Sequence, residues 1–207
     1  MMDRASAKAR MQERILQITD RLFYEQGIRA VGVDTVAAEI GISKRTLYNY
    51  YASKDELILA YLSRRFQPLP LGDQPPAEQI LANFDRLERA FSDSRFRGCP
   101  FVNAVAELKE PTHAANQIAL AFKNERRAWF RELLMRLEVA DPDGLASQLM
   151  LLVDGAIAAA VVRGDPAMAR VARSAAITLL RAAGVAIPKV DVAGKPARKR
   201  AAPRKPK

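Results

Sequence analysis

The chain has 207 residues, and 49% of them are apolar, which is enough to build one or two packed domains without stabilising cross-links. Its one cysteine, Cys99, and its one histidine, His113, exclude an internal disulfide and a Cys/His metal cluster, and no cofactor is predicted. Residues 185–207 hold eight Lys/Arg and one Asp, so they contribute +7 of the formal net charge of +10. This Pro-, Ala- and Lys/Arg-rich tail is predicted to be disordered, and it either binds polyanions without reading sequence or only keeps the chain soluble.

The most apolar stretch of the chain, residues 145–162, has Asp154 near its middle. A charge at that depth makes a membrane span costly, so we expect a buried helix and no membrane partner. Without a signal-like N-terminus, a cytoplasmic location is expected.

Four helices are predicted before residue 67, because apolar residues recur there at helical spacing. The first two end at glycines, the second of them at Gly41. The third is short, over residues 44–50, with Ser43 as its N-cap. Ser53 and Glu56 have the spacing of a capping box, which opens a fourth helix that runs to residue 66.

The second and third predicted helices are joined by a tight turn, EIGIS, at the spacing of a helix-turn-helix unit. The second helix of such a unit enters the DNA major groove by its N-terminal end, which here carries Lys44 and Arg45. Arg can bond a guanine bidentately, and Asn49 can pair with an adenine edge. Hydroxyl and amine groups that can bind phosphate oxygens are present on Thr46, Tyr48 and Lys54.

A Pro-rich segment, QPLPLGDQPP, indicates a linker at residues 67–76. Further helices are predicted around residues 80–91, from Pro100, and over residues 112–138, 143–163 and 166–183. The predicted fold class is all-α, with about nine helices. The predicted division is a helix-turn-helix head at residues 1–66, a helical body at 67–184 and the tail at 185–207.

Residues 13–62 resemble the N-terminal DNA-binding domain of TetR-type transcriptional regulators, through the sequences ILQITDRLFYEQG and VDTVAAEIGISKRTLYNYYASKDELI. The resemblance implies an all-helical homodimer in which a three-helix head binds a palindromic double-stranded DNA operator and a helical body binds a small molecule. It places DNA contacts on Thr46, Tyr48, Asn49, Tyr50 and Lys54, with Lys44 and Arg45 as base readers.

Two positions depart from the pattern of that family. Arg45 stands where a small residue is common, which suggests an extra base or phosphate contact. Gly32 stands where a Thr or Ser often caps the second helix, so Thr35 or Asp34 is expected to take over the cap or the phosphate contact.

The resemblance also implies a ligand pocket in the body, although the spacing of its apolar residues is equally that of core residues. The expected lining residues are Phe66, Phe84, Leu87, Cys99, Asn103, Phe122, Trp129, Met150 and Asp154. For the carboxylate of Asp154 three surroundings stay open: a cationic ligand, an Arg across the dimer, or solvent.

The segment RGCPFVNAVAEL resembles the start of the corresponding helix in one large group of TetR-type regulators. Pro100 suits the first helical position, which makes Cys99 the N-cap. The helix dipole and the nearby Arg95 or Arg97 favour a thiolate, so Cys99 is either a reactive sensor of oxidants or electrophiles or an inert buried residue.

Small residues at positions 155–160 permit close approach of two helices, and with the last helix they form the predicted dimer interface. Its residues are Ala156, Ala159, Ala160, Ile177 and Leu180.

The predicted function is a sequence-specific DNA-binding regulator, a repressor that an unknown small-molecule inducer releases from its operator. The alternatives are a repressor of the same fold that senses oxidants through Cys99, and a nucleic-acid-associated protein dominated by its basic tail. An enzyme is not predicted, since the sequence has no phosphate-binding glycine loop and no nucleophile elbow.

Overall fold

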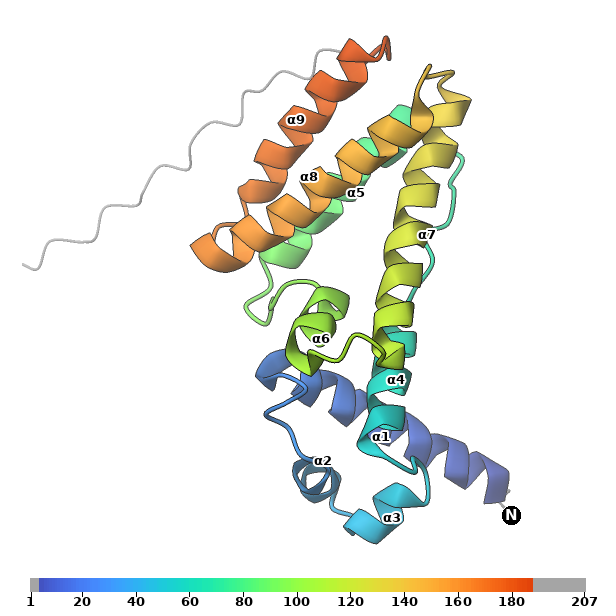
Figure 1. The fold of residues 1–207 in the computed structure, drawn as a ribbon, viewed down its shortest axis with the longest axis vertical. Coiled ribbons are helices and arrows are strands. Elements are labelled where there is room, and N and C mark those ends of the chain that lie inside the picture. Colours follow the sequence, from blue (N-terminus) through green and yellow to red (C-terminus); the bar gives the residue numbers. More distant parts are fainter. Residues whose placement is uncertain (1–3, 188–207) are drawn as a thin grey trace, which may run out of the picture.

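The computed structural model describes residues 4–187, and within that range the chain is all-α, as predicted. A small head, α1–α4, lies at one end of an elongated molecule, and a larger body, α5–α9, lies at the other (Figure 1). The nine helices of the described range are α1 (Arg4–Gln26), α2 (Val33–Ile40), α3 (Lys44–Tyr48), α4 (Lys54–Arg65), α5 (Pro76–Phe91), α6 (Pro100–Leu108), α7 (Ala114–Arg136), α8 (Pro142–Arg163) and α9 (Met168–Ala182). Most of the predicted basic tail, from residue 188 on, lies outside the described residues.

Local capping signals set the helix boundaries in the head. The Ser43 hydroxyl accepts a hydrogen bond from the Thr46 backbone N–H at 3.0 Å, and the Ser53 hydroxyl accepts one from Glu56 at 3.1 Å. Gly41 closes α2 with a φ of 79°, a left-handed conformation that glycine adopts without a Cβ clash. The prediction for α3 was two residues too long: the helix ends at Tyr48, and Asn49 is its C-cap.

The core of the head continues into the body. Ile15, Val36, Leu47 and Leu62 are buried against one another, and the rings of Phe23 and Tyr61, on α1 and α4, meet edge to face at 5.7 Å. The same apolar cluster includes Phe101 of α6 and the first turns of α7. The core is therefore not divided at residue 66, and α6 and α7 can transmit a displacement between body and head.

The Pro-rich linker is bound to α7 by hydrogen bonds. The Glu125 carboxylate accepts from the Leu69 N–H at 3.2 Å, and the Trp129 indole N–H donates to the Pro70 carbonyl at 3.3 Å. The Arg126 guanidinium donates to the Gln67 carbonyl at 2.6 Å. The connection between α4 and α5 is thus held along the side of α7.

The core of the body lies between α5, α7, α8 and α9, with Phe84, Leu133, Leu149 and Leu180 among its fully buried side chains. Val185 belongs to this core, so the packed region extends past the predicted start of the tail. Within the described range, only α8 is long and apolar enough to cross a membrane by length and composition. In the fold α8 packs against α7 and α9 (Figure 1).

Candidate nucleic-acid interface and ligand pocket

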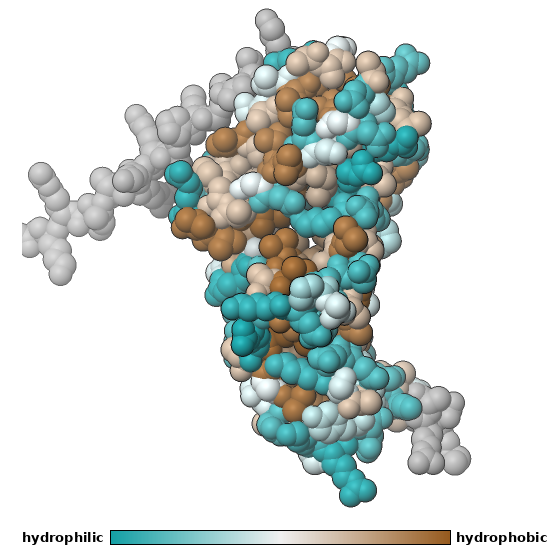
Figure 2. All heavy atoms as spheres, viewed as in Figure 1, coloured by the Kyte–Doolittle hydropathy of each residue, from teal (hydrophilic) through white to brown (hydrophobic). Residues whose placement is uncertain are grey.

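The tip of the head is formed by α2 and α3, and its surface is mostly hydrophilic (Figures 1 and 2). α1 holds this unit in place: the Arg14 guanidinium donates to the Ile40 carbonyl at 3.0 Å, and Arg21 forms an ion pair with Glu39. Leu47 of α3 is fully buried in the head core. Burial of Leu47 turns the opposite face of α3 outward.

The two cations at the N-terminal end of α3 have different surroundings. The Lys44 amine pairs with the Asp34 carboxylate of α2 at 3.0 Å, and this hydrogen bond raises the pKa of Lys44. Arg45 is exposed, and within residues 4–187 its side chain makes no hydrogen bond or ion pair. Arg45 can therefore bind a partner molecule without breaking a side-chain contact. Lys44 can do so only if its ion pair with Asp34 breaks.

The other polar residues of this segment differ in how accessible they are. Tyr48 and Asn49 are exposed, Tyr48 by 39%. The Thr46 hydroxyl lies 2.8 Å from the Ser43 hydroxyl and shares a hydrogen bond with it. Tyr50 is half-buried and packs against the head core, so Tyr48 and Asn49 offer the more accessible groups.

Two further predicted contacts lie beside α3. Lys54 is the first residue of α4 and is half-buried, and burial lowers the pKa of its amine. Thr35 is exposed on the first turn of α2, while Asp34 is held by Lys44, and Gly32 caps α2 without a side chain. The sequence reasoning missed the length of α1, whose N-terminal end carries the exposed Lys8 and reaches the same end of the molecule as α3 (Figure 1).

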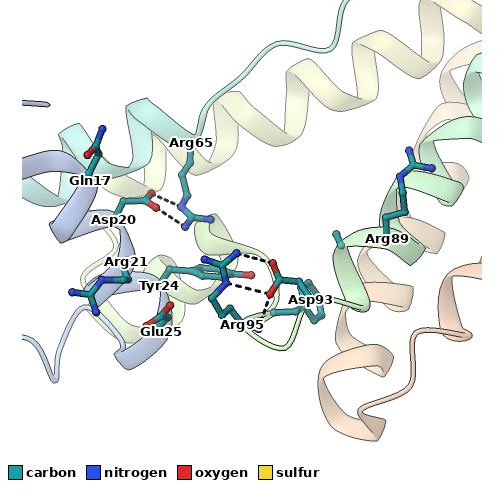
Figure 3. A pocket seen from close by; sticks show the side chains of 11 residues that line it. Gln17, Asp20, Arg21, Tyr24, Glu25, Arg65, Arg89, Asp93 and Arg95 are labelled. Carbon is teal, nitrogen blue, oxygen red and sulfur yellow. Dashed lines mark hydrogen bonds and ion pairs between the residues drawn. The ribbon is translucent and has the colours of Figure 1, made fainter. Parts of the chain in front are cut away.

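A polar cleft of about 710 Å³ separates the head from the end of α5 (Figure 3). On its head side, Arg65 of α4 binds Asp20 of α1 through two hydrogen bonds of 2.6 and 2.8 Å. The same guanidinium lies 4.1 Å from the centre of the Tyr24 ring. On the body side, Arg95 pairs with Asp93 at 3.0 Å.

Tyr24 joins the head to the body through its hydroxyl. This group donates to the Gly98 carbonyl and accepts from the Arg97 backbone N–H, both at 3.0 Å. Tyr24 lines the polar cleft on one side and a second, apolar pocket on the other. A molecule in either space would touch the same head-to-body contact.

The apolar pocket has a volume of about 360 Å³ and lies between α1, α5, α7, α8 and the start of α6. Of the nine residues expected to line a pocket, five do so here: Leu87, Cys99, Phe122, Met150 and Asp154. Four do not, namely Phe66, Phe84, Asn103 and Trp129.

Each of these four side chains is used elsewhere in the fold. Phe84 is buried in the body core, and Trp129 is buried with its indole bonded to Pro70. The Asn103 amide donates to the Arg97 carbonyl at 2.8 Å. Phe66 lies behind the pocket wall, edge-on to Phe122 at 5.6 Å.

The polar residues of the pocket were mostly missed from the sequence. Lys123 of α7 forms an ion pair with Asp154, a partner that was not among the three predicted surroundings, and the Asp154 side chain is also 39% exposed. Arg86 and Arg126 also line the pocket. Burial lowers the pKa of the Arg126 guanidinium, and nearby Glu125 opposes that shift. These residues come from three helices, α5, α7 and α8, so no local pattern brings all of them together.

The predicted dimer residues are largely covered within the chain. Ala156, Ala160 and Leu180 are buried in the body core, because the small side chains let α8 and α9 pack closely inside one chain. Ala159 and Ile177 are half-buried. The large apolar side chains that are exposed on these helices are Leu151, Val161, Val162 and Val171.

Comparisons with known proteins agree with this architecture. Residues 15–61 match the model of the bacterial regulatory proteins of the tetR family. A Streptomyces avermitilis structure described as that of a TetR transcriptional regulator is 34% identical, with 84% of this chain and 98% of that chain covered and a TM-score of 0.75. A TetR-family transcriptional regulator from Streptomyces coelicolor is 31% identical, with coverages of 86% and 96% and a TM-score of 0.75. The HTH-type transcriptional regulator YjdC of Escherichia coli is 28% identical over 82% of this chain and 93% of its own length.

Proposed function

The chain belongs to the TetR family of DNA-binding transcriptional regulators, and from this premise we propose that it is a dimeric repressor that a small molecule releases from a palindromic operator. The observation that carries the proposal is the exposed N-terminal end of α3, with the cap Ser43 and the side chains of Lys44 and Arg45 at the tip of the head. Because the protein acts on DNA, we place it in the cytoplasm.

In the proposed complex, α3 enters the major groove and two classes of contact form. Arg45, Asn49 and Lys44 read base edges, with Lys44 released from Asp34 on binding. Phosphate oxygens are bound by Thr35, Thr46, Tyr48, Tyr50 and Lys54. We add Lys8 to this second class, since α1 extends toward the same end of the molecule.

The proposed dimer forms through the outward face of α8 together with α9. Leu151, Gly155, Ala158 and Val162 recur at helical spacing on α8 and are all exposed, Leu151 by 71% and Val162 by 86%. Val171 of α9 is 61% exposed. A second copy would cover these side chains, which would account for a helix that carries apolar residues outward as well as toward the core.

The proposed induction path runs from the pocket along α7 to α4. Phe122 lines the pocket and contacts Phe66 at the end of α4, while Arg126 holds the Gln67 carbonyl. A ligand that moves α7 side chains would swing α4 and with it the head. Release follows only if the ligand binds better to a form whose two heads no longer match the operator half-sites.

A second candidate signal is oxidation of Cys99, favoured by its position in the wall of the pocket, which Arg126 also lines. A Cys99→Ser protein that is released from DNA by peroxide or quinones as readily as the wild type would remove this candidate.

The repressor proposal is tested with a reporter gene fused to the region upstream of the protein's own gene. Deletion of the regulator should raise reporter expression, and the purified protein should protect an imperfect palindrome in that region from nuclease. Expression that falls on deletion would mean that the protein activates this promoter. No protection and no change in expression would contradict the proposal for this promoter.

A further inference from the structure

The apolar pocket has a hydrophobic wall and, at one side, several charged groups. Its wall includes Leu87, Phe91, Phe122, Phe130 and Ile157, and its volume of about 360 Å³ falls at the lower end of the range for ligand sites. Three cationic side chains, Arg86, Lys123 and Arg126, line it against one lining carboxylate, Asp154. An apolar ligand with a charged end would match this division.

Arg126 lines this pocket and has a buried donor without a hydrogen-bond partner. Its side chain is 16% exposed and lies over the Phe122 ring, 4.7 Å from the ring centre. One terminal nitrogen, Nη2, donates to the Gln67 carbonyl, but the other, Nη1, is buried and has no hydrogen-bond partner within the described chain. A buried cationic donor without a partner is costly, and an acceptor supplied by a ligand would offset that cost.

The neighbouring charges leave this side of the pocket positive. Lys123 and Asp154 neutralise each other in an ion pair. A carboxylate oxygen of Glu125 lies 3.5 Å from the Nε atom of Arg126. This long ion pair offsets one of the two positive charges of Arg86 and Arg126. Arg86 is exposed and close enough to lower the pKa of Arg126 by repulsion. One positive charge therefore has no counter-charge among these pocket groups.

We propose that the ligand of this pocket is an apolar molecule with one anionic group, such as a hydrophobic carboxylate, whose anion is bound by the guanidinium of Arg126 with help from Arg86. The aromatic and aliphatic wall takes the apolar part. This inference rests on the proposed function for its regulatory meaning. The binding itself can be measured without DNA, so its failure and the failure of the repressor proposal are separate results.

The probes are two fluorescent dyes with the same aromatic skeleton. 1-Anilinonaphthalene-8-sulfonate carries one negative charge, and N-phenyl-1-naphthylamine lacks the sulfonate and is neutral. Both are titrated into the full chain and into the Arg126→Met variant, which keeps an unbranched, flexible stem and removes the guanidinium and its charge. Arg127→Met is the matched control, since Arg127 is the next residue of α7 and pairs with Asp143 outside the pocket.

The expected result is a loss of about 10- to 100-fold in sulfonate dye affinity for Arg126→Met, the range for one charge-assisted hydrogen bond. The neutral dye and the Arg127→Met control should change less than about threefold. Decanoate should displace the sulfonate dye, and decanol of the same chain length should not. Equal losses for both dyes, no loss for either, or equal displacement by decanol would overturn the proposal. If Arg126→Met fails to fold, Arg86→Met is measured in its place, with a weaker effect of the same selectivity expected.

Discussion

Replacing Tyr24 with Phe removes the hydroxyl that joins the head to the body and keeps the aromatic ring. The hydroxyl makes two hydrogen bonds of 3.0 Å, to the Gly98 carbonyl and from the Arg97 N–H. The ring stays beside Arg65, so that contact is retained. The substitution therefore isolates the two hydrogen bonds.

The expected cost in free energy of unfolding is about 1–3 kcal/mol. Each neutral hydrogen bond contributes roughly 0.5–1.5 kcal/mol net. Gly98 is buried, so its carbonyl loses its partner without full access to water, whereas the exposed Arg97 can turn its N–H to solvent. This places the effect in the middle or upper part of the range.

The assay is urea denaturation followed by circular dichroism at one fixed protein concentration, because the stability of a dimer depends on concentration. Tyr48→Phe is the control, since Tyr48 is exposed and its hydroxyl has no hydrogen bond within the described chain. It should change stability by less than about 0.5 kcal/mol. A Tyr24→Phe protein as stable as the Tyr48→Phe protein would refute the role assigned to this hydroxyl.

Three further substitutions test the head and the dimer. Arg45→Ala should relax discrimination at one operator base pair by about 1–3 kcal/mol in titrations of base-substituted operators, and an equal loss on every sequence would indicate a phosphate contact instead. Ser53→Ala removes the cap of α4 and should lower the free energy of unfolding by about 1 kcal/mol, read from the same urea curves; no change would mean that the cap adds nothing. Val162→Glu should convert the proposed dimer to a monomer in light scattering at unchanged helix content, because Val162 is exposed in the single chain; a variant that stays dimeric would exclude this face of α8.

The head could be predicted closely because its signals are local. Caps such as Ser43, Ser53 and Gly41 act within one helical turn, and the sequence around them determines where each helix starts or stops. The early end of α3 was missed because Asn49 and Tyr50 carry no stop signal of their own.

The pocket could be predicted only in part because its charged groups meet through tertiary packing. Lys123 and Asp154 are 31 positions apart on two helices. The sequence around either residue does not indicate that the other is its partner. Arg126 is one of several arginines on α7, and only the fold directs it toward the pocket while Arg127 binds Asp143. Small residues such as Ala156 and Ala160 indicate that two helices pack closely. Whether those helices belong to one chain or to two depends on which face of α8 turns toward the core, and here the face with Ala156 and Ala160 does.

The most direct test of the central claim is a titration of DNA at about 150 mM salt, where non-specific binding is weak. The full chain and a chain ending at residue 187 would each be titrated with the region upstream of the protein's own gene and with a shuffled fragment of equal composition. We predict a preference of about 10³-fold or more for the native fragment that survives removal of the tail, because the residues proposed to read bases lie in the head. Equal affinity for both fragments, lost when the tail is removed, would contradict sequence reading by the head at this region.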